Sequence, residues 1–255
     1  MIQKIIDQHN HDKIKYDYCS NPEFLREGAA IRDFLHPDRI VLGTTSDKAF
    51  EYLKDVYRPL YINETPMVHT TVETAEMIKY AANAFLAIKI SYINEVANLC
   101  DEIGADVHVV AKTLGMDGRI SPKFLHPGPG FGGSCFPKDT KALVKIAKKY
   151  NIDMATVTAA IKTNIFQRKR MLNKLNDLLD NDLKGKIIAV LGLAFKQETD
   201  DVRESPAIEI ITGIHDKGGI IKAYDPIAND SMREIFPALE DRKSTRLNSS
   251  HSEIS

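Results

Sequence analysis

The sequence has few cysteines, no long hydrophobic run and almost no net charge, and each of these features excludes a class of protein. The three cysteines, Cys19, Cys100 and Cys135, cannot all pair within one chain, and none has the CxxC or Cys/His spacing of a zinc site. The longest apolar run, residues 187–195, is far shorter than the roughly 20 residues that cross a bilayer. With 34 basic and 35 acidic residues, the net charge of −1 provides no bulk attraction to nucleic acid.

The first residues also lack the pattern of a secretory signal, since residues 1–10 are polar and mixed in charge. We therefore expect a protein of a reducing, cytoplasmic compartment, with no metal and with neither nucleic acid nor membrane as a partner. A length of 255 residues with 43% hydrophobic residues fits a globular protein that buries its own core.

The order of helix and strand patterns predicts an α/β fold with a helical centre. Before the first strand, Asn21 followed by Pro22 is typical of a helix start and Gly28 of a helix end, which predicts a short helical turn. Near the C-terminus, two apolar runs flank a Ser-Pro helix start, as in the β-α-β units of parallel sheets. The predicted strands are residues 39–43, 60–63, 187–192 and 220–224, and the predicted helices are residues 21–28, 46–57, 70–103, 106–114, 138–150, 154–180 and 205–218.

Residues 70–103 carry the strongest helix pattern of the chain. Thr70 followed by Glu73 is a capping-box pattern, Gly104 supplies a stop, and apolar residues recur at helical spacing between them. About 33 residues at 1.5 Å each make a helix of roughly 50 Å, a length typical of helices that run between domains or between subunits. A plain core helix is the alternative interpretation.

The sharpest chemical pattern is the glycine-rich segment GFGGSCFPKD at residues 130–139. Its glycines let backbone amides approach a ligand closely. Cys135 is expected near the start of the following helix, where the helix dipole and Lys138 activate a thiol as a nucleophile. Asp139 lies about one turn further on, so covalent catalysis is one interpretation. A structural cysteine beside a tight turn is the other, and it is the one we expect for Cys19 and Cys100.

Two more constellations place polar groups together in the predicted helices. Glu23 and Glu27 share one face if residues 21–28 are helical, and paired carboxylates can divide into acid and base roles. Lys79 and Asn83 lie four residues apart on the long helix among small and apolar neighbours, where a lysine can stabilise an oxyanion or a phosphate. The alternatives are a solvated acidic face and a lysine that reaches from a buried face to solvent.

A fourth constellation follows the predicted strand 187–192. Lys196 and Arg203 lie beyond its carboxyl end, which is where parallel α/β sheets bind ligands, and two cations suit a phosphate. An ordinary basic loop is the alternative.

Together these segments resemble the UDP-glucose dehydrogenase family of nucleotide-sugar dehydrogenases. The resemblance runs from about residue 21 to residue 237 and rests on four motifs in order: NPEFLREG at 21–28, IKYAANAF at 78–85, GFGGSCFPKD at 130–139, and GLAFK at 192–196 with RESP at 203–206. It implies a four-electron oxidation of UDP-glucose to UDP-glucuronate with NAD as cofactor. The route that it implies passes through a thiohemiacetal and a thioester on a cysteine.

The resemblance also implies roles for single residues. Cys135 is the implied nucleophile, with Lys79 as oxyanion partner and Asn83 beside it, while Asp139 orders the catalytic water. Glu27 is the implied acid/base carboxylate, and Glu23 lies in the same substrate-facing segment. The implied substrate contacts are Glu23, Phe24, Leu25, Arg26, Glu27, Lys79, Asn83, Arg119, Phe124, Leu125, His126, Gly130, Phe131, Gly132 and Lys196. The implied NAD contacts are Glu27, Cys135, Lys138 and Arg203.

The same resemblance implies how the chain divides. Residues 1–69 are the expected end of a Rossmann-like NAD-binding domain, residues 70–182 an all-helical central domain with the long helix, and residues 183–241 the start of a second Rossmann-like, UDP-binding domain. The Ser- and Asn-rich residues 242–255 are an expected disordered, non-native tail. No G-x-G-x-x-G follows any predicted strand, so the dinucleotide fingerprint is missing. We therefore expect a fragment that by itself has little or no dehydrogenase activity.

Other functions remain compatible with the same residues. The nearest keeps the mechanism and changes the sugar to GDP-mannose or UDP-N-acetylmannosamine. A second is a non-catalytic dimerisation module built on the helices at 70–103 and 154–180, and a third is a cofactor-free thiol enzyme that uses Cys135. We expect a homodimer formed through the long central helix.

Overall fold

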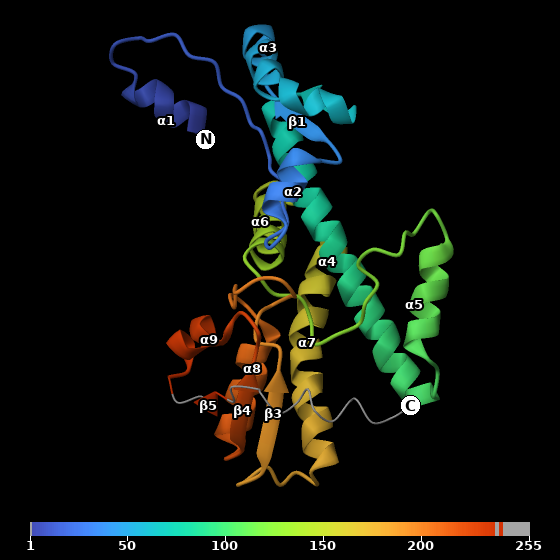
Figure 1. The fold of residues 1–255 in the computed structure, drawn as a ribbon. Helices are drawn as coiled ribbons and strands as arrows, with labels where there is room; N and C mark the ends of the chain where they lie inside the picture. The colour runs from blue at the N-terminus through green and yellow to red at the C-terminus, as the bar shows by residue number, and fades with distance from the viewer. Residues whose placement is uncertain (1, 238–239, 242–255) are drawn as a thin grey trace. The chain divides into compact units, whose positions relative to one another are not determined.

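The computed structural model describes residues 2–237 and 240–241, and it confirms a mixture of helices and short parallel sheets (Figure 1). The predicted tail at 242–255 lies outside the described residues. The helices are α1 (Ile2–His9), α2 (Ala30–Leu35), α3 (Asp47–Val56), α4 (Val72–Ile103), α5 (Val107–Met116), α6 (Cys135–Lys149), α7 (Ala155–Leu178), α8 (Pro206–Asp216), α9 (Asn229–Ile235) and the 3₁₀ helix η1 (Arg58–Asn63). The strands are β1 (Ile40–Gly43), β2 (Met67–Thr70), β3 (Ile187–Leu191), β4 (Ile220–Tyr224) and β5 (Glu240–Asp241).

The chain divides into two compact units, Met1–Ala82 and Asn83–Ser255. The boundary falls inside α4, so this helix begins in the first unit and ends in the second, which is the course that its length predicts. The three-domain division implied by the resemblance is a finer one and stays a prediction.

The first unit is built around a parallel pair of strands. β1 pairs with β2 from Ile40 opposite Met67 onward, and α3 lies between them in the chain, as in half of a doubly wound sheet. All four residues of β1 are buried, because both faces of a parallel strand are covered. Ser46 caps α3, and its hydroxyl accepts a hydrogen bond from the Ala49 amide at 3.2 Å.

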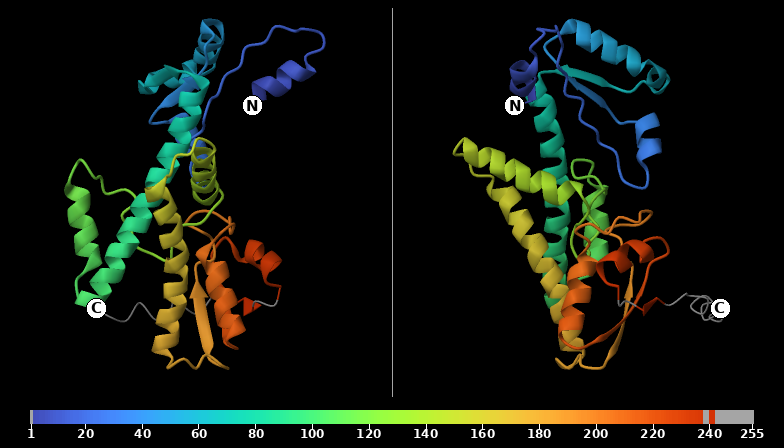
Figure 2. Two further views of the ribbon diagram at one scale, coloured as in Figure 1. Left: turned by 180° about the vertical axis from the view of Figure 1, so that it is seen from behind. Right: turned by 90° about the vertical axis from the view of Figure 1, so that its left-hand side faces the viewer.

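The second unit combines a helical part with a parallel sheet in the order β3-β4-β5. The predicted β-α-β unit is confirmed: β3 and β4 pair in parallel with Ile187 opposite Ile220, and α8 connects them. Helices α6 and α7 form a hairpin, and α7 also packs along α8 (Figure 2). The core beneath the sheet includes Leu193, Ile211 and Met232, each at most 1% exposed.

Polar side chains tie α4 to α7 along the helical part. The Ser91 hydroxyl donates to the Ala160 carbonyl at 3.0 Å, and the Asn98 amide donates to the Gln167 side chain at 2.9 Å. These contacts are buried or half-buried, so each hydrogen bond also satisfies a group that water does not reach freely.

Three local predictions are wrong. Residues 21–28 are not helical; the Asn21 side chain donates to the Val41 carbonyl and accepts from the Tyr57 hydroxyl instead of capping a helix. The predicted strand at 60–63 is the end of η1, and the strand follows at β2. Thr70 ends β2, and Thr71 caps α4 by accepting from the Thr74 amide at 3.3 Å.

The other boundaries agree with the patterns. Asp106 caps α5 by accepting from the His108 amide at 2.8 Å, and Gly104, with φ of 71°, ends α4. The main shift is that α6 begins at Cys135 rather than at residue 138. Among the helices of residues 2–237, none combines the length and apolar character that crossing a membrane requires.

Candidate functional site

Cys135 is the first residue of α6. Directly before it lie residues 128–134, which we call the glycine loop. Its side chain is half-buried, and the Ser134 hydroxyl lies 3.6 Å from Sγ. Gly130 and Gly133 take φ values of 112° and 78°, a region that residues with a Cβ rarely adopt, so the approach to the helix depends on glycine. The thiol thus lies at a helix N-terminus, as the sequence predicts.

One turn further along α6, Asp139 forms a buried polar cluster. It is 1% exposed, and one carboxylate oxygen accepts from the Asn83 amide at 2.6 Å. The other oxygen pairs with the ammonium group of Lys138. The structure therefore brings together three of the predicted site residues, Asn83, Lys138 and Asp139. A carboxylate fixed in this way keeps one orientation.

The glycine loop packs against the segment that precedes α8. The Gly133 amide donates to the Arg203 carbonyl at 2.8 Å. A Cβ built on Gly132 would overlap the Glu204 carbonyl group, lying 2.9 Å from its carbon and 3.0 Å from Phe195 Cβ. The glycine loop and residues 195–204 are therefore in backbone contact. This contact brings the glycines of the GFGGSCFPKD motif next to the GLAFK and RESP motifs.

We expect Gly132→Ala to destabilise the second unit by about 2 kcal/mol, because the added methyl group meets backbone that cannot rotate away. Gly128→Ala is the matched control from the same loop, since a Cβ there meets no atom within 4 Å. The measurement is the free energy of unfolding in urea. Equal losses in the two variants would show that the loop does not pack against Glu204 as described.

Asp225 organises the loop after β3, and the sequence analysis did not single it out. Its carboxylate accepts from the Leu193, Ala194, Ile227 and Ala228 amides at 2.8–3.2 Å. Burial by itself would raise the pKa of Asp225, but the four backbone donors outweigh it and hold the pKa below its ordinary value. The sequence feature that could have identified Asp225 is its position directly after a predicted parallel strand.

Lys196 and Arg203 border this loop. Arg203 forms a two-pronged pair with Asp201, with Nε at 2.9 Å and Nη2 at 2.7 Å from the carboxylate oxygens. The ammonium group of Lys196 lies 5.7 Å from the centre of the Phe195 ring. Both cations lie beyond the carboxyl end of β3, as predicted, and the Arg203 side chain is 65% exposed.

In the first unit, Lys79 is held by the NPEF segment. Its ammonium group donates to the Glu23 carbonyl at 2.5 Å and to the Glu23 carboxylate at 3.0 Å. It also lies 5.5 Å from the centre of the Phe24 ring, and only 17% of its side chain is exposed. Lys79 is therefore a partnered, half-buried lysine and does not extend to solvent.

Glu23 and Glu27 do not share a helical face, because residues 21–28 form no helix. The Glu23 carboxylate instead accepts from the Leu25 amide at 2.7 Å, which stabilises a turn. Glu27 is half-buried just before α2. The expectation of two carboxylates on one helix was wrong for this reason, whereas the roles implied for them by the resemblance stay predictions.

Other predicted contacts are placed as follows. Arg26 pairs with Asp33 at 2.6 Å and Arg119 with Asp117 at 2.5 Å, and each carboxylate raises the pKa of its arginine. Half-buried Phe124 and buried Leu125 and Phe131 belong to packed parts of the second unit, whereas His126 is exposed. The Phe124 and Phe131 rings both contact Phe136, with centres 6.0 Å apart.

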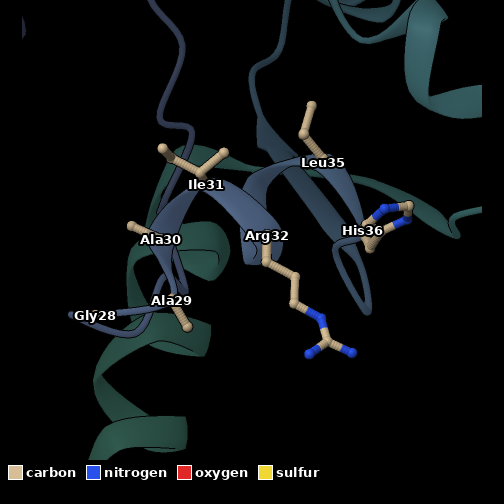
Figure 3. A pocket seen from close by; sticks show the side chains of 7 residues that line it. All are labelled: Gly28, Ala29, Ala30, Ile31, Arg32, Leu35 and His36. Carbon is tan, nitrogen blue, oxygen red and sulfur yellow. The ribbon is translucent and has the colours of Figure 1, made fainter. Parts of the chain in front are cut away.

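A shallow hollow of about 650 Å³ lies along α2, lined by Gly28, Ala29, Ala30, Ile31, Arg32, Leu35 and His36 (Figure 3). Figure 3 shows Ile31 and Leu35 extending to one side and Arg32 to the other, so polar groups do not converge there. None of the predicted site residues lines it. Residues 2–237 and 240–241 also contain no group of three or more His, Cys, Asp or Glu side chains placed to hold a metal ion.

Comparisons with known proteins agree on one family. Sequence models for three domains of the UDP-glucose/GDP-mannose dehydrogenase family match successive parts of the chain: the NAD binding domain residues 1–61, the central domain residues 73–165, and the UDP binding domain residues 189–254. The last match continues into residues 242–255, which we predicted to be a tail.

Relatives with known names match most of the chain. UDP-glucose 6-dehydrogenase of Rhizobium meliloti (strain 1021) is 50% identical over 87% of this chain and 51% of its own length. UDP-glucose 6-dehydrogenase TuaD of Bacillus subtilis (strain 168) is 49% identical over 89% of this chain and 49% of its own length. A solved UDP-glucose dehydrogenase from Pyrobaculum islandicum has a TM-score of 0.88 and 38% identity, over 92% of this chain and 54% of that chain. This chain spans about half the length of the curated relatives it matches.

Proposed function

Because this chain belongs to the UDP-glucose/GDP-mannose dehydrogenase family, we propose that it serves the NAD-dependent oxidation of UDP-glucose to UDP-glucuronate. The observation that carries the proposal is the arrangement of Cys135 at the start of α6, one turn before a buried Asp139 that Asn83 holds at 2.6 Å. A nucleophile one helical turn before a fixed carboxylate suits acyl chemistry in which water must attack last.

The described residues fit parts of an NAD site. NAD⁺, when bound, accepts the hydride in each of the two oxidations. Lys138 and Arg203, with side chains 66% and 65% exposed, offer positive charge to its phosphates, and Glu27 and Cys135 are the other proposed contacts. No G-x-G-x-x-G follows a strand among the described residues, so we assign these residues as contacts and not as the main phosphate cradle.

Cys135 supplies the covalent step. Its sulfur adds to the C6 aldehyde carbon, and the carbonyl oxygen takes a proton to form a thiohemiacetal. Oxidation of that carbon then leaves a thioester, and water cleaves the C–S bond to release the carboxylate and the thiol. We propose that Asp139 orders this water and that Lys79 stabilises the oxyanion, with Glu27 as acid/base group. The remaining substrate contacts are those that the resemblance implies.

The test is NADH formation at 340 nm with UDP-glucose, GDP-mannose and UDP-N-acetylmannosamine in separate reactions. It is run on two proteins. One is the 255-residue chain, and the other is a chimaera in which this chain is joined to those parts of TuaD that it does not match. We expect the chimaera to form two NADH per UDP-glucuronate and the chain alone to form little. Faster turnover of either other sugar would overturn the choice of substrate, and no turnover with any of them would favour a non-catalytic module.

We further propose a homodimer formed through α4, within a reducing cytoplasmic compartment that the three unpaired cysteines support. Phe85, Tyr92 and Leu99 lie seven residues apart on α4 and are 54–62% exposed, a spacing that makes one apolar stripe. Large apolar side chains in a row are typical of an interface.

We expect the double variant Phe85→Glu/Leu99→Glu to weaken dimerisation about 100-fold or more, because two carboxylates replace buried apolar area. Sedimentation velocity of the chain measures this. Glu76→Lys, at an exposed polar position of the same helix, is the control and should sediment like the native chain. A native chain that sediments as a monomer would contradict the proposal.

A further inference from the structure

The glycine loop is anchored by polar side chains of α7 that the proposed mechanism does not use. Asn164, 7% exposed, pairs with both backbone groups of Phe131: its side-chain oxygen accepts from the amide at 2.7 Å, and its nitrogen donates to the carbonyl at 3.0 Å. One turn on, the Gln167 side chain donates to the Gly128 carbonyl at 2.8 Å. Side chains of α7 therefore hold the backbone of this loop at Gly128 and Phe131.

Arg168, from the same face of α7, joins this loop to a second segment. Its Nη2 donates to the Phe131 carbonyl at 2.9 Å and to the Glu204 carbonyl at 2.9 Å. The side chain is only 12% exposed, and Nη1 lies 3.9 Å and 3.7 Å from the carboxylates of Glu204 and Glu209. One guanidinium group thus binds the carbonyl of Phe131, 37 residues before Arg168 in the chain, and that of Glu204, 36 residues after it.

The backbone of Glu204, one of the two residues that Arg168 binds, is held in an unfavourable conformation. Glu204 has a φ of 52°, which is costly for a residue with a side chain and persists only when its surroundings hold it. Its carbonyl group is also the one against which Gly132 packs. If the bond from Arg168 were lost, Glu204 could relax toward an ordinary conformation, and the carbonyl group that supports the loop three residues before Cys135 would move.

We infer that Arg168 is a positioning residue for the proposed reaction: it acts through the backbone of Phe131 and Glu204 and holds the loop in the conformation that presents the Cys135 thiol. The inference rests on the proposed function for its catalytic consequence. The guanidinium group suits the task because its donors have a fixed, planar geometry, whereas a lysine offers one compact ammonium group.

The test compares Arg168→Gln and Arg168→Lys with the matched control Arg170→Gln. Arg170 lies on the same helix and its Nη2 also bonds a backbone carbonyl, that of Asn98, but it pairs with Asp101 and Glu102 and does not reach the loop. The first measurement, on the 255-residue chain, is the rate of Cys135 alkylation by iodoacetamide, located by peptide mass spectrometry. We expect Arg168→Gln to raise this rate about threefold or more by opening the loop, with Arg170→Gln near the native rate.

The second measurement is turnover of the chimaera completed with TuaD, where a loop misplaced by about 1 Å can cost about 100-fold in kcat. We expect that loss for Arg168→Gln with the KM for NAD⁺ within about twofold of native, and a smaller loss for Arg168→Lys, which keeps the charge. Arg168→Lys also serves if Arg168→Gln fails to fold. Native alkylation in both Arg168 variants, or equal changes in Arg170→Gln, would overturn the inference. If the chimaera with Arg168 unchanged forms no NADH, the proposed function fails, while the alkylation comparison still decides whether Arg168 positions the loop.

Discussion

In the chimaera completed with TuaD, replacement of Cys135 by serine is expected to stop the second of the two proposed oxidations of UDP-glucose and to leave the first. The first oxidation converts an alcohol to an aldehyde and needs no sulfur, whereas the second needs a covalent adduct from which a hydride can leave. A serine hydroxyl is a far weaker nucleophile than a thiol unless a base activates it. We expect UDP-glucuronate formation to fall about 1,000-fold or more, and the NADH formed per UDP-glucose to fall from two to at most one.

Cys19→Ser is the matched control for this variant. Cys19 is also half-buried, but it lies in the first unit, where its thiol contacts the Ser20 carbonyl at 3.7 Å. Burial raises the pKa of the Cys19 thiol, so at neutral pH it stays protonated and unreactive. The stoichiometry of two NADH per sugar should therefore survive Cys19→Ser. A Cys135→Ser protein that still forms UDP-glucuronate at the native rate would contradict the thioester route.

Asp225→Ala is expected to destabilise the second unit by about 3 kcal/mol. The substitution removes the acceptor of four backbone amides, two of them in the loop after β3 that leads to Lys196. Asp225 is buried, so these amides find no easy replacement in water, and each unsatisfied donor costs free energy. Urea unfolding measures the loss. Asp230→Ala is the control: its carboxylate is 93% exposed, and the change should stay within about 0.5 kcal/mol.

The Asp225 carboxylate makes the free energy of unfolding depend on pH. Because the pKa of Asp225 is lower in the folded protein than in the unfolded chain, the unfolded chain binds a proton first as the pH falls. The contribution of Asp225 is therefore complete above its ordinary pKa of about 3.9 and is lost as the pH falls through the folded value. We expect the stability difference between the native protein and Asp225→Ala to shrink below about pH 4. A difference that is constant from pH 7 to pH 2 would show that the carboxylate charge plays no part.

The sequence predicted those parts of the site whose residues are neighbours in the chain, and it missed the contacts between residues far apart. Cys135 was correctly placed near a helix start because the glycine run and the following helix pattern are neighbours in the chain. Asn83 and Asp139 were singled out separately, but their bond joins residues 56 positions apart, which no local pattern encodes. Arg168 and Asn164 were missed, although polar residues spaced four apart on α7 were a visible signal.

By itself the sequence determined the long α4, the β3-α8-β4 unit and the family, because periodic apolar patterns and contiguous motifs carry that information. Only the tertiary structure decided that residues 21–28 are not helical. Asn21 and Pro22 begin helices well in isolation, yet the Asn21 side chain is bonded to Val41 and Tyr57, 20 and 36 residues away. Helix propensity is worth a few tenths of a kcal/mol per residue, so such long-range hydrogen bonds override it.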